Sequence, residues 1–453
     1  MSHEQRRLAD YKSEGPKMSK KIQPVVAVFL LSGLLATSVL ISVSTAATQR
    51  QRTTVASSTA KNAAIVATTA AVLKETSEIR ELPILRPVKS GAQSRAEIER
   101  MVIRNLDAET TPAEMHATEV ALRKLGLAPP DFRYRPFVIK LLTEQVAGYY
   151  DPRMQEFFLA DWIDLEGQKP VMAHELTHAL QDQHFNLRRF EHWPKGDADA
   201  KLAAHALIEG DATLAMTIYM AKYPLVALAF IRALGSTSTS SEQFKQAPRA
   251  LRESLVFPYQ EGAEWATVLY KRGGWNMISR AFTELPQSTE QILHSDKYFS
   301  HEAPVKISLP DVRALLGPGW TRIDYDVNGE WSYYLILDQF LNSPAESRRA
   351  AAGWGGDRYE IYEGPQPDDV LLAQLSAWDT ETDAREFFDA YAKRTALRYE
   401  NAKAHENVAQ GDRHEWSTSE DGVVLELRGK RVLIIEGVPA NTNADALTKA
   451  LWQ

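Results

Sequence analysis

Two histidines in the sequence have the spacing that lets them bind one metal ion. Residues 174–178 read His-Glu-Leu-Thr-His. Positions four apart on a helix lie about 40° apart on one face, so His174 and His178 can reach the same ion. Glu175 lies next to the first ligand and can take a proton from a water that the metal activates. The motif predicts a zinc site with His174 and His178 as ligands and Glu175 as general base and proton shuttle.

The composition restricts the chemistry of this site. The chain of 453 residues has 11 histidines and no cysteine, which excludes disulfides, thiolate nucleophiles, cysteine-based zinc sites and iron–sulfur clusters. Histidine and carboxylate ligands favour zinc, although manganese and cobalt also fit them. A net charge of −7 argues against a nucleic-acid partner, which needs a dense basic patch.

A catalytic zinc needs a third protein ligand and one open position. We expect the third ligand to be Glu209, in the segment IEGDAT. This segment resembles the gluzincins, whose third ligand is a glutamate on a later helix. Asp211 is two residues further on, whereas thermolysin-like enzymes have an aspartate four residues on, where this chain has Thr213. Asp211 can still orient a ligand imidazole.

Two other histidines are alternatives for the third ligand. His184 completes a spacing that resembles the metzincins, but Gln181 stands where that family has a glycine. On a continuous helix His184 would lie about 120° from His178 and would not reach the same metal. His205, one turn before Glu209, is the remaining alternative.

Hydrolysis also needs an oxyanion donor and a surface that holds the substrate. Gluzincins supply a tyrosine or histidine from a downstream segment, and the candidates here are Tyr259 and His294, with Tyr298 as a weaker one. We expect residues 154–159, just before the metal-binding helix, to form an edge strand that pairs with an extended peptide. The alternative for this segment is an ordinary core strand.

Residues from about 80 to 450 resemble an uncharacterised family of predicted zinc metallopeptidases of the bacterial envelope. The resemblance is carried by the segments LGLAPPDF, EQVAGYYDP, HELTHALQDQHF, IEGDAT, FPYQEG, STEQILH and GWGGDRY. It implies a zinc metallopeptidase and brings no substrate. Together with the amino-terminal segment, it leads us to expect a zinc-dependent enzyme that hydrolyses peptide bonds of an envelope or extracellular substrate. The alternative is a zinc-binding envelope scaffold or peptide-binding folding factor without hydrolytic activity.

The amino-terminal region has the pattern of a membrane segment. A basic stretch, residues 1–23, precedes an uncharged apolar run within 24–47 that is long enough to cross a bilayer. The positive-inside rule keeps the basic end in the cytoplasm, so the body would be periplasmic or at the cell surface. A cleaved signal, leading to secretion, is the alternative to a retained anchor.

The rest of the chain predicts an α+β protein. Residues 48–78 are rich in alanine and threonine and are expected to form a linker or weak helix. A mainly helical, zincin-like catalytic domain with a small β-sheet is expected over 79–310, with helix caps at Ser94 and Thr111. Residues 223–235 are expected to form a core helix. Strand patterns after 350 predict a smaller α+β domain over 311–453.

Overall fold

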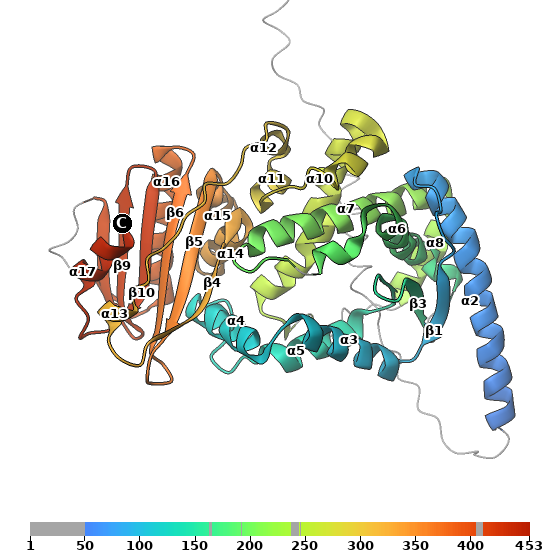
Figure 1. Ribbon diagram of the computed structural model, residues 1–453, viewed down its shortest axis with the longest axis horizontal. Coiled ribbons are helices and arrows are strands. Elements are labelled where there is room, and N and C mark those ends of the chain that lie inside the picture. The colour runs from blue at the N-terminus through green and yellow to red at the C-terminus, as the bar shows by residue number, and fades with distance from the viewer. Residues whose placement is uncertain (1–49, 163–164, 192, 237–243, 245, 405–410) are drawn as a thin grey trace, which may run out of the picture.

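The computed structural model describes residues 50–453 except 163–164, 192, 237–243, 245 and 405–410. The expected α+β class is confirmed: one end of the molecule is helical with a three-stranded sheet, and the other carries a seven-stranded antiparallel sheet (Figure 1). The expected amino-terminal membrane segment, 24–47, lies outside the described residues.

The helical part contains these elements in chain order: α2 (Arg50–Arg80), β1 (Lys89–Gln93), α3 (Arg95–Glu109), α4 (Pro112–Lys124), α5 (Tyr134–Gln145), β2 (Gly148–Asp151), β3 (Glu156–Ala160), α6 (Lys169–Phe185), α7 (Ala198–Lys222), α8 (Pro224–Ser236), α10 (Arg249–Ala281), α11 (Thr289–Leu293) and α12 (Ser295–Phe299). The expected caps are present, because Ser94 and Thr111 each form a capping box at the start of α3 and α4.

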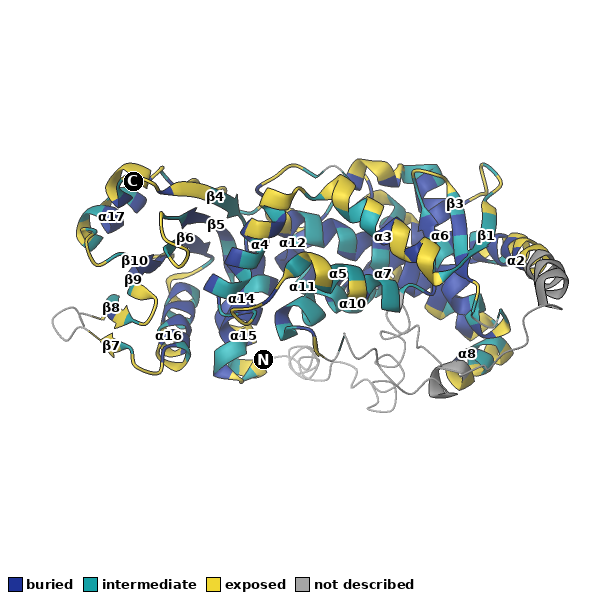
Figure 2. Ribbon diagram, turned by 90° about the horizontal axis from the view of Figure 1, so that it is seen from below, coloured by how far each residue is buried: buried dark blue, intermediate teal, exposed yellow. Residues whose placement is uncertain are grey.

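Helices α6 and α7 form the centre of the helical part. Met172, Ala173 and Leu176 on α6 are fully buried, and so are Ala203 and Ala204 on α7. Figure 2 shows both helices among the most deeply buried elements. The sequence motif on α6 therefore lies in the core and not on the surface.

Residues 48–78 were expected to form a linker or a weak helix; the helix is confirmed for 50–78, but it is part of the folded body and not a tether. They form α2, which packs against α6, α7 and β1. A stripe along α2 is buried, with Ile65, Val72 and Thr76 each at most 1% exposed. Small alanine and threonine side chains let the helices approach closely, so a segment with few large apolar residues still contributes to the core.

Helix α8 was expected to be a core helix, and this is only partly correct. Phe230 is buried, but Leu225 is 81% exposed and Ile231 is 45% exposed. Among the residues that the structure describes, no single helix is long and apolar enough to cross a membrane. Helix α7 and residues 224–232 meet that criterion only when they are taken together, and the pair is bent by 110°. The criterion concerns only length and composition.

The carboxyl-terminal part is built on the seven-stranded sheet. Its elements are α13 (Arg313–Leu316), β4 (Thr321–Asp326), α14 (Gly329–Leu341), α15 (Pro344–Ala351), β5 (Trp354–Glu363), β6 (Val370–Trp378), α16 (Glu381–Arg398), β7 (Lys403–Ala404), β8 (Arg413–Thr418), β9 (Asp421–Arg428), β10 (Arg431–Val438) and α17 (Ala444–Leu451). The strand order is β4-β5-β6-β10-β9-β8-β7.

Both faces of the sheet are covered, which explains why its central strands are apolar at almost every position. On β10, Val432 and Ile434 join the core that α16 shares with the helical part, while Leu433 and Ile435 face α17. The first of these cores is one continuous cluster of buried side chains, whose members come from the whole stretch between Ile65 and Ile434. The expected division at residue 310 is therefore a change of architecture and not a gap in the core.

A buried ion pair fixes the sheet to the helical part. Arg394 on α16 donates to Glu436 on β10 at 2.6 Å and to the carbonyl of Leu125, just after α4, at 2.6 Å. Arg398 also bonds Glu436 and the carbonyl of Lys124. Burial alone would raise the pKa of Glu436, but the two arginines lower it to about 2. The pair holds α4 against the sheet.

We predict that Glu436→Gln destabilises the protein by about 3–5 kcal/mol at pH 7, because it leaves buried arginines without their counter-charge. The folded pKa, about 2, lies below the unfolded value of 4.5, so the carboxylate stabilises above pH 4.5 and this is lost as the pH falls toward 2. Urea unfolding at pH 7 and pH 3 measures both effects. Glu386→Gln on α16, whose partner Arg349 is exposed, is the control and should cost about 0–1 kcal/mol. Equal losses in the two variants would contradict this account.

Candidate metal centre

Three predicted ligands from two helices converge in the core. Nε2 of His174 lies 3.2 Å from Nε2 of His178 and 3.1 Å from a carboxylate oxygen of Glu209, and Nε2 of His178 lies 3.4 Å from the same oxygen. The two histidines come from α6 and the glutamate from α7. One donor atom from each residue falls within 4.8 Å of the others, which is a spacing that one metal ion can bridge. We call these three residues the metal trio.

The structure separates the three candidates for the third ligand. Nε2 of His184 donates to the carbonyl of Pro83 at 2.7 Å, so its ring is engaged outside the trio. His205 lies one turn before Glu209 on α7, and burial together with nearby Lys201 lowers the pKa of His205 to about 4. Only Glu209 places a donor atom among the two histidine nitrogens.

A hydrogen-bond chain fixes which nitrogen His178 presents to the trio. The amide N–H groups of Gln181 donate to the carbonyl of Ile208 at 3.0 Å and to Asp211 at 2.8 Å. The Gln181 oxygen therefore accepts from Nδ1 of His178, at 2.8 Å. Nε2 of His178 is left without its proton in the neutral ring, as a metal ligand requires.

The far end of this chain is Arg80, the last residue of α2. Its Nε donates to Asp211 at 2.5 Å, and both side chains are fully buried. Asp211 was expected to orient a ligand imidazole directly, but it acts through Gln181. Sequence reasoning did not find the roles of Gln181 and Arg80. The signal at Gln181 was its position three residues after His178, where one helical turn brings the two side chains together. Nδ1 of His174, by contrast, is buried without a hydrogen-bond partner among the described residues.

A close crossing of α7 and α10 brings Tyr259 to the trio. A Cβ atom on Gly210 would lie 2.2 Å from the carbonyl oxygen of Gly262, and one on Gly262 would lie 2.2 Å from the carbonyl oxygen of Ala206. Only glycine permits this approach. One turn away, Tyr259 stacks on His174 with ring centroids 5.9 Å apart, and its hydroxyl lies within the electrostatic reach of Glu209. Burial and the neighbouring carboxylates raise the pKa of Tyr259, so its hydroxyl keeps its proton.

Glu175 lies beside the trio in a half-buried position. Its carboxylate accepts from the backbone N–H of Tyr150 on β2 at 3.1 Å. Burial raises the pKa of Glu175 above its usual value, although His178 and His174 oppose this shift. A raised pKa suits a carboxylate that must accept and return a proton near neutral pH.

The strand beside the site is not the one that we expected. Residues 154–159 fall largely in β3, but the sheet order is β1-β3-β2, so β3 is central and its two edges are occupied. The strand next to α6 is β2, an edge strand. Tyr150 directs its N–H away from β3 and toward Glu175, so the free edge of β2 faces the site. The prediction failed because the pairing order of short strands is not encoded in their local pattern.

The structure does not bring His294 or Tyr298 to the trio. The His294 ring bonds Glu330 at 2.9 Å, and this bond raises the pKa of His294. The Tyr298 hydroxyl donates to the carbonyl of Glu284 at 2.9 Å. Of the predicted oxyanion donors, only Tyr259 is adjacent to the trio. His294 was misplaced because its position follows from a contact with α14, 36 residues away in the sequence.

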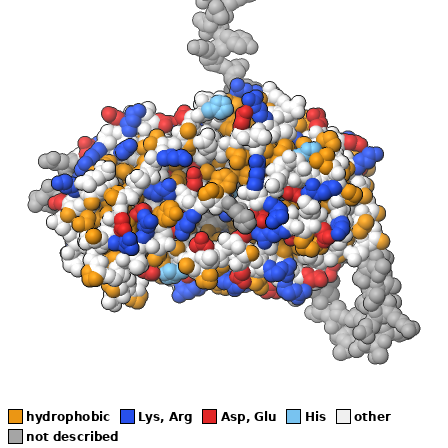
Figure 3. Space-filling model, in the orientation of Figure 1, with side chains coloured by type: hydrophobic (Ala, Val, Ile, Leu, Met, Phe, Trp, Pro, Cys, Tyr) orange, Lys and Arg blue, Asp and Glu red, His pale blue; other side chains and the backbone are white. Residues whose placement is uncertain are grey.

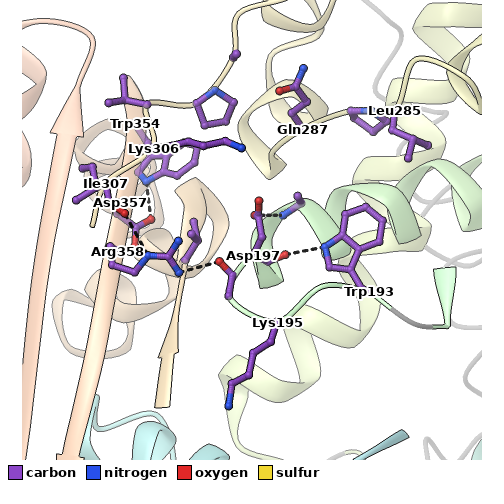
Figure 4. Close-up of a pocket in the computed structure, with 18 residues that line it drawn as sticks. Trp193, Lys195, Asp197, Leu285, Gln287, Lys306, Ile307, Trp354, Asp357 and Arg358 are labelled. Atoms are coloured by element: carbon purple, nitrogen blue, oxygen red, sulfur yellow. Dashed lines mark hydrogen bonds between the residues drawn. The ribbon is translucent and has the colours of Figure 1, made fainter. Parts of the chain in front are cut away.

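Cavities lie both at the trio and away from it. One of about 270 Å³ is lined by Glu209, His205 and residues of β2. A larger one, of about 510 Å³, lies where the helical part meets the sheet and contains no member of the trio (Figure 4). Its charged groups serve the fold: Asp357 accepts from Trp354 and two backbone N–H groups, and Arg358 donates to the carbonyl of Gly196. The smaller cavity is the one next to the candidate chemistry.

Comparison with known proteins gives one match. The model of a domain of unknown function (DUF8575) matches residues 315–448, less than a third of the chain. The matched segment runs from the end of α13 into α17 and includes no residue of the metal trio. No curated protein and no solved structure matches the chain.

We predict that Gln181→Leu weakens metal binding about 10–100-fold, because Nδ1 of His178 loses the acceptor that fixes its ring. Competition with a chelator of known affinity measures the change in the full chain. Gln183→Leu on the same helix is the matched control, because Gln183 bonds the backbone of residues 85 and 86 and does not contact the trio. An equal loss of affinity in both variants would argue against this role for Gln181.

Proposed function

We propose that this protein is a zinc-dependent metallopeptidase that hydrolyses peptide bonds of an envelope or extracellular protein. The observation that carries the proposal is the convergence of His174, His178 and Glu209 on one point, with Glu175 beside it. In this proposal the helical part is a zincin-like catalytic domain, and the third ligand is of the gluzincin type.

The donor set fits the proposed metal. Two imidazole nitrogens and one carboxylate oxygen form the three-ligand set typical of catalytic zinc, which leaves a position open for water or substrate. The orientation of His178 by Gln181 is of the kind that accompanies zinc ligands in proteins. Zinc at this place would lower the pKa of a water molecule and polarise the carbonyl that is attacked.

The residues of the chain have separate roles in the proposed reaction. Glu175 accepts a proton from the attacking water and returns it to the leaving amine. The Tyr259 hydroxyl, which keeps its proton, donates a hydrogen bond to the oxygen that becomes negative. The free edge of β2 holds the substrate backbone by strand addition, so that the peptide lies next to Glu175.

The alternative is a zinc-binding scaffold or folding factor that holds peptides without cleaving them. Such a site would be closed by an additional ligand, for which His184 was the candidate. His184 is instead hydrogen-bonded to the carbonyl of Pro83, outside the trio, and this favours a site with an open position. The amino-terminal segment, 24–47, is proposed to anchor the protein in the membrane or to be removed as a signal, with the body outside the cytoplasm.

We predict that Glu175→Gln lowers kcat about 10²–10⁴-fold, because the amide cannot accept the proton, while the metal content stays at one zinc per chain. Cleavage of unfolded protein or a peptide library, read by mass spectrometry, measures activity, and elemental analysis measures zinc. Glu166→Gln, a mostly exposed glutamate just before α6, is the control and should retain activity. Unchanged cleavage by the Glu175 variant would overturn the mechanism, and zinc without cleavage in the wild type would favour the scaffold.

A further inference from the structure

A groove extends from the metal trio along α7. The cavity at Glu209 and a second one, of about 450 Å³, share Lys201, Glu109 and Glu191 in their linings. The second cavity continues between α4, α7 and α10 to Asp324 and other residues of the carboxyl-terminal part. Figure 3 shows this face of the molecule hollowed near its middle. We call the two joined cavities the α7 groove.

The α7 groove has the length of a short extended peptide. From Glu209 to Ala198, which both line it, α7 advances eleven residues, or about 16 Å at 1.5 Å per residue. An extended chain advances about 3.3 Å per residue, so about five substrate residues fit on this side of the trio. A groove of this length suits a polypeptide better than a dipeptide.

One cation in the groove has no ion-pair partner among the described residues. Lys201, His205 and Glu209 follow one another at four-residue spacing and therefore lie along one face of α7. The Lys201 side chain is half-buried, and neither a hydrogen bond nor an ion pair joins it to any other residue that the structure describes. Its charge does reach the site, since it lowers the pKa of His205.

The other cations of the groove are already neutralised. Arg153 bonds Glu109 at 2.8 Å and Glu191 at 3.0 Å, and Lys195 lies 3.5 Å from Asp324. Because Arg153 engages Glu109 and Glu191, these two glutamates do not hold Lys201. A third glutamate of the groove, Glu114, has its pKa lowered by hydrogen bonds from Thr111 and by the charge of Lys201, but its carboxylate caps α4 and forms no ion pair with Lys201. A carboxylate from a bound molecule would give Lys201 the direct counter-charge that it lacks among the described residues.

We propose that Lys201 selects a carboxylate of an extended peptide substrate, three to four residues from the bond that is cut. The register follows from the separation of Lys201 and Glu209, which are eight positions and about 12 Å apart along the helix. The carboxylate belongs to an aspartate or glutamate side chain or to the end of the peptide. The inference rests on the proposed function and deepens it, because it names the substrate class and gives the groove a binding role.

The test measures binding separately from cleavage. Fluorescent ten-residue peptides, each with one aspartate at a different position, are titrated into full-length Glu175→Gln protein and compared with peptides that carry asparagine there. We expect one position to favour aspartate. Adding Lys201→Met should then weaken the binding of that aspartate peptide about 10–100-fold, as expected when a charge-assisted hydrogen bond is lost. The affinity for the corresponding asparagine peptide should stay unchanged. Lys201→Arg should retain the preference.

Controls separate the remaining explanations. Lys222→Met, at the exposed carboxyl end of α7, should leave all affinities unchanged. Amidated and free carboxyl ends distinguish a terminal carboxylate from a side chain, and either result supports the inference. Equal binding of aspartate and asparagine peptides, or equal loss in the two methionine variants, would overturn it. Peptides that bind with the predicted preference but are not cut by the wild type would defeat the proposed hydrolase while leaving the carboxylate site intact.

Discussion

The meeting of α6, α7 and α10 in the core is the constraint on which the rest of the site depends. Glycines 210 and 262 let α7 and α10 cross with backbone nearly in contact, and this places Glu209 between Tyr259 and the two histidines of α6. A side chain at either glycine would push α7 and α10 apart and so move Tyr259 away from the metal trio. The convergence of side chains therefore comes from helix packing, and not only from the spacing of the motif within α6.

The carboxyl-terminal sheet supports the same site from a distance. Arg394 and Arg398 hold the end of α4 by its backbone carbonyls, and both are anchored on buried Glu436. Helix α4 forms one wall of the α7 groove, and Asp324 of β4 lies at the far end of that groove. The family match of unknown function covers this sheet and no member of the metal trio, so the match and the candidate chemistry belong to different parts of one continuous core.

Local patterns predicted the parts of this structure that depend on local geometry. The helical period placed both histidines on one face of α6, the capping residues located α3 and α4, and the apolar runs located the central strands. Contacts distant in sequence were not predictable in this way. The link from Arg80 to Asp211 spans 131 residues, and the bond that holds His294 away from the trio depends on α14. The same limitation explains why β3 was mistaken for the edge strand and why the packing of α2 against the folded body was not predicted.

The most direct test of the account is the metal content of the full-length protein, measured by elemental analysis for the wild type, Glu209→Ala and His184→Ala. The account predicts one zinc per chain in the wild type and in His184→Ala, and loss of zinc in Glu209→Ala, because only Glu209 has a donor atom at the trio. Zinc that is lost with His184→Ala but retained with Glu209→Ala would contradict the proposed ligand set. Absence of bound metal in the wild type, even after zinc is added, would contradict the central claim.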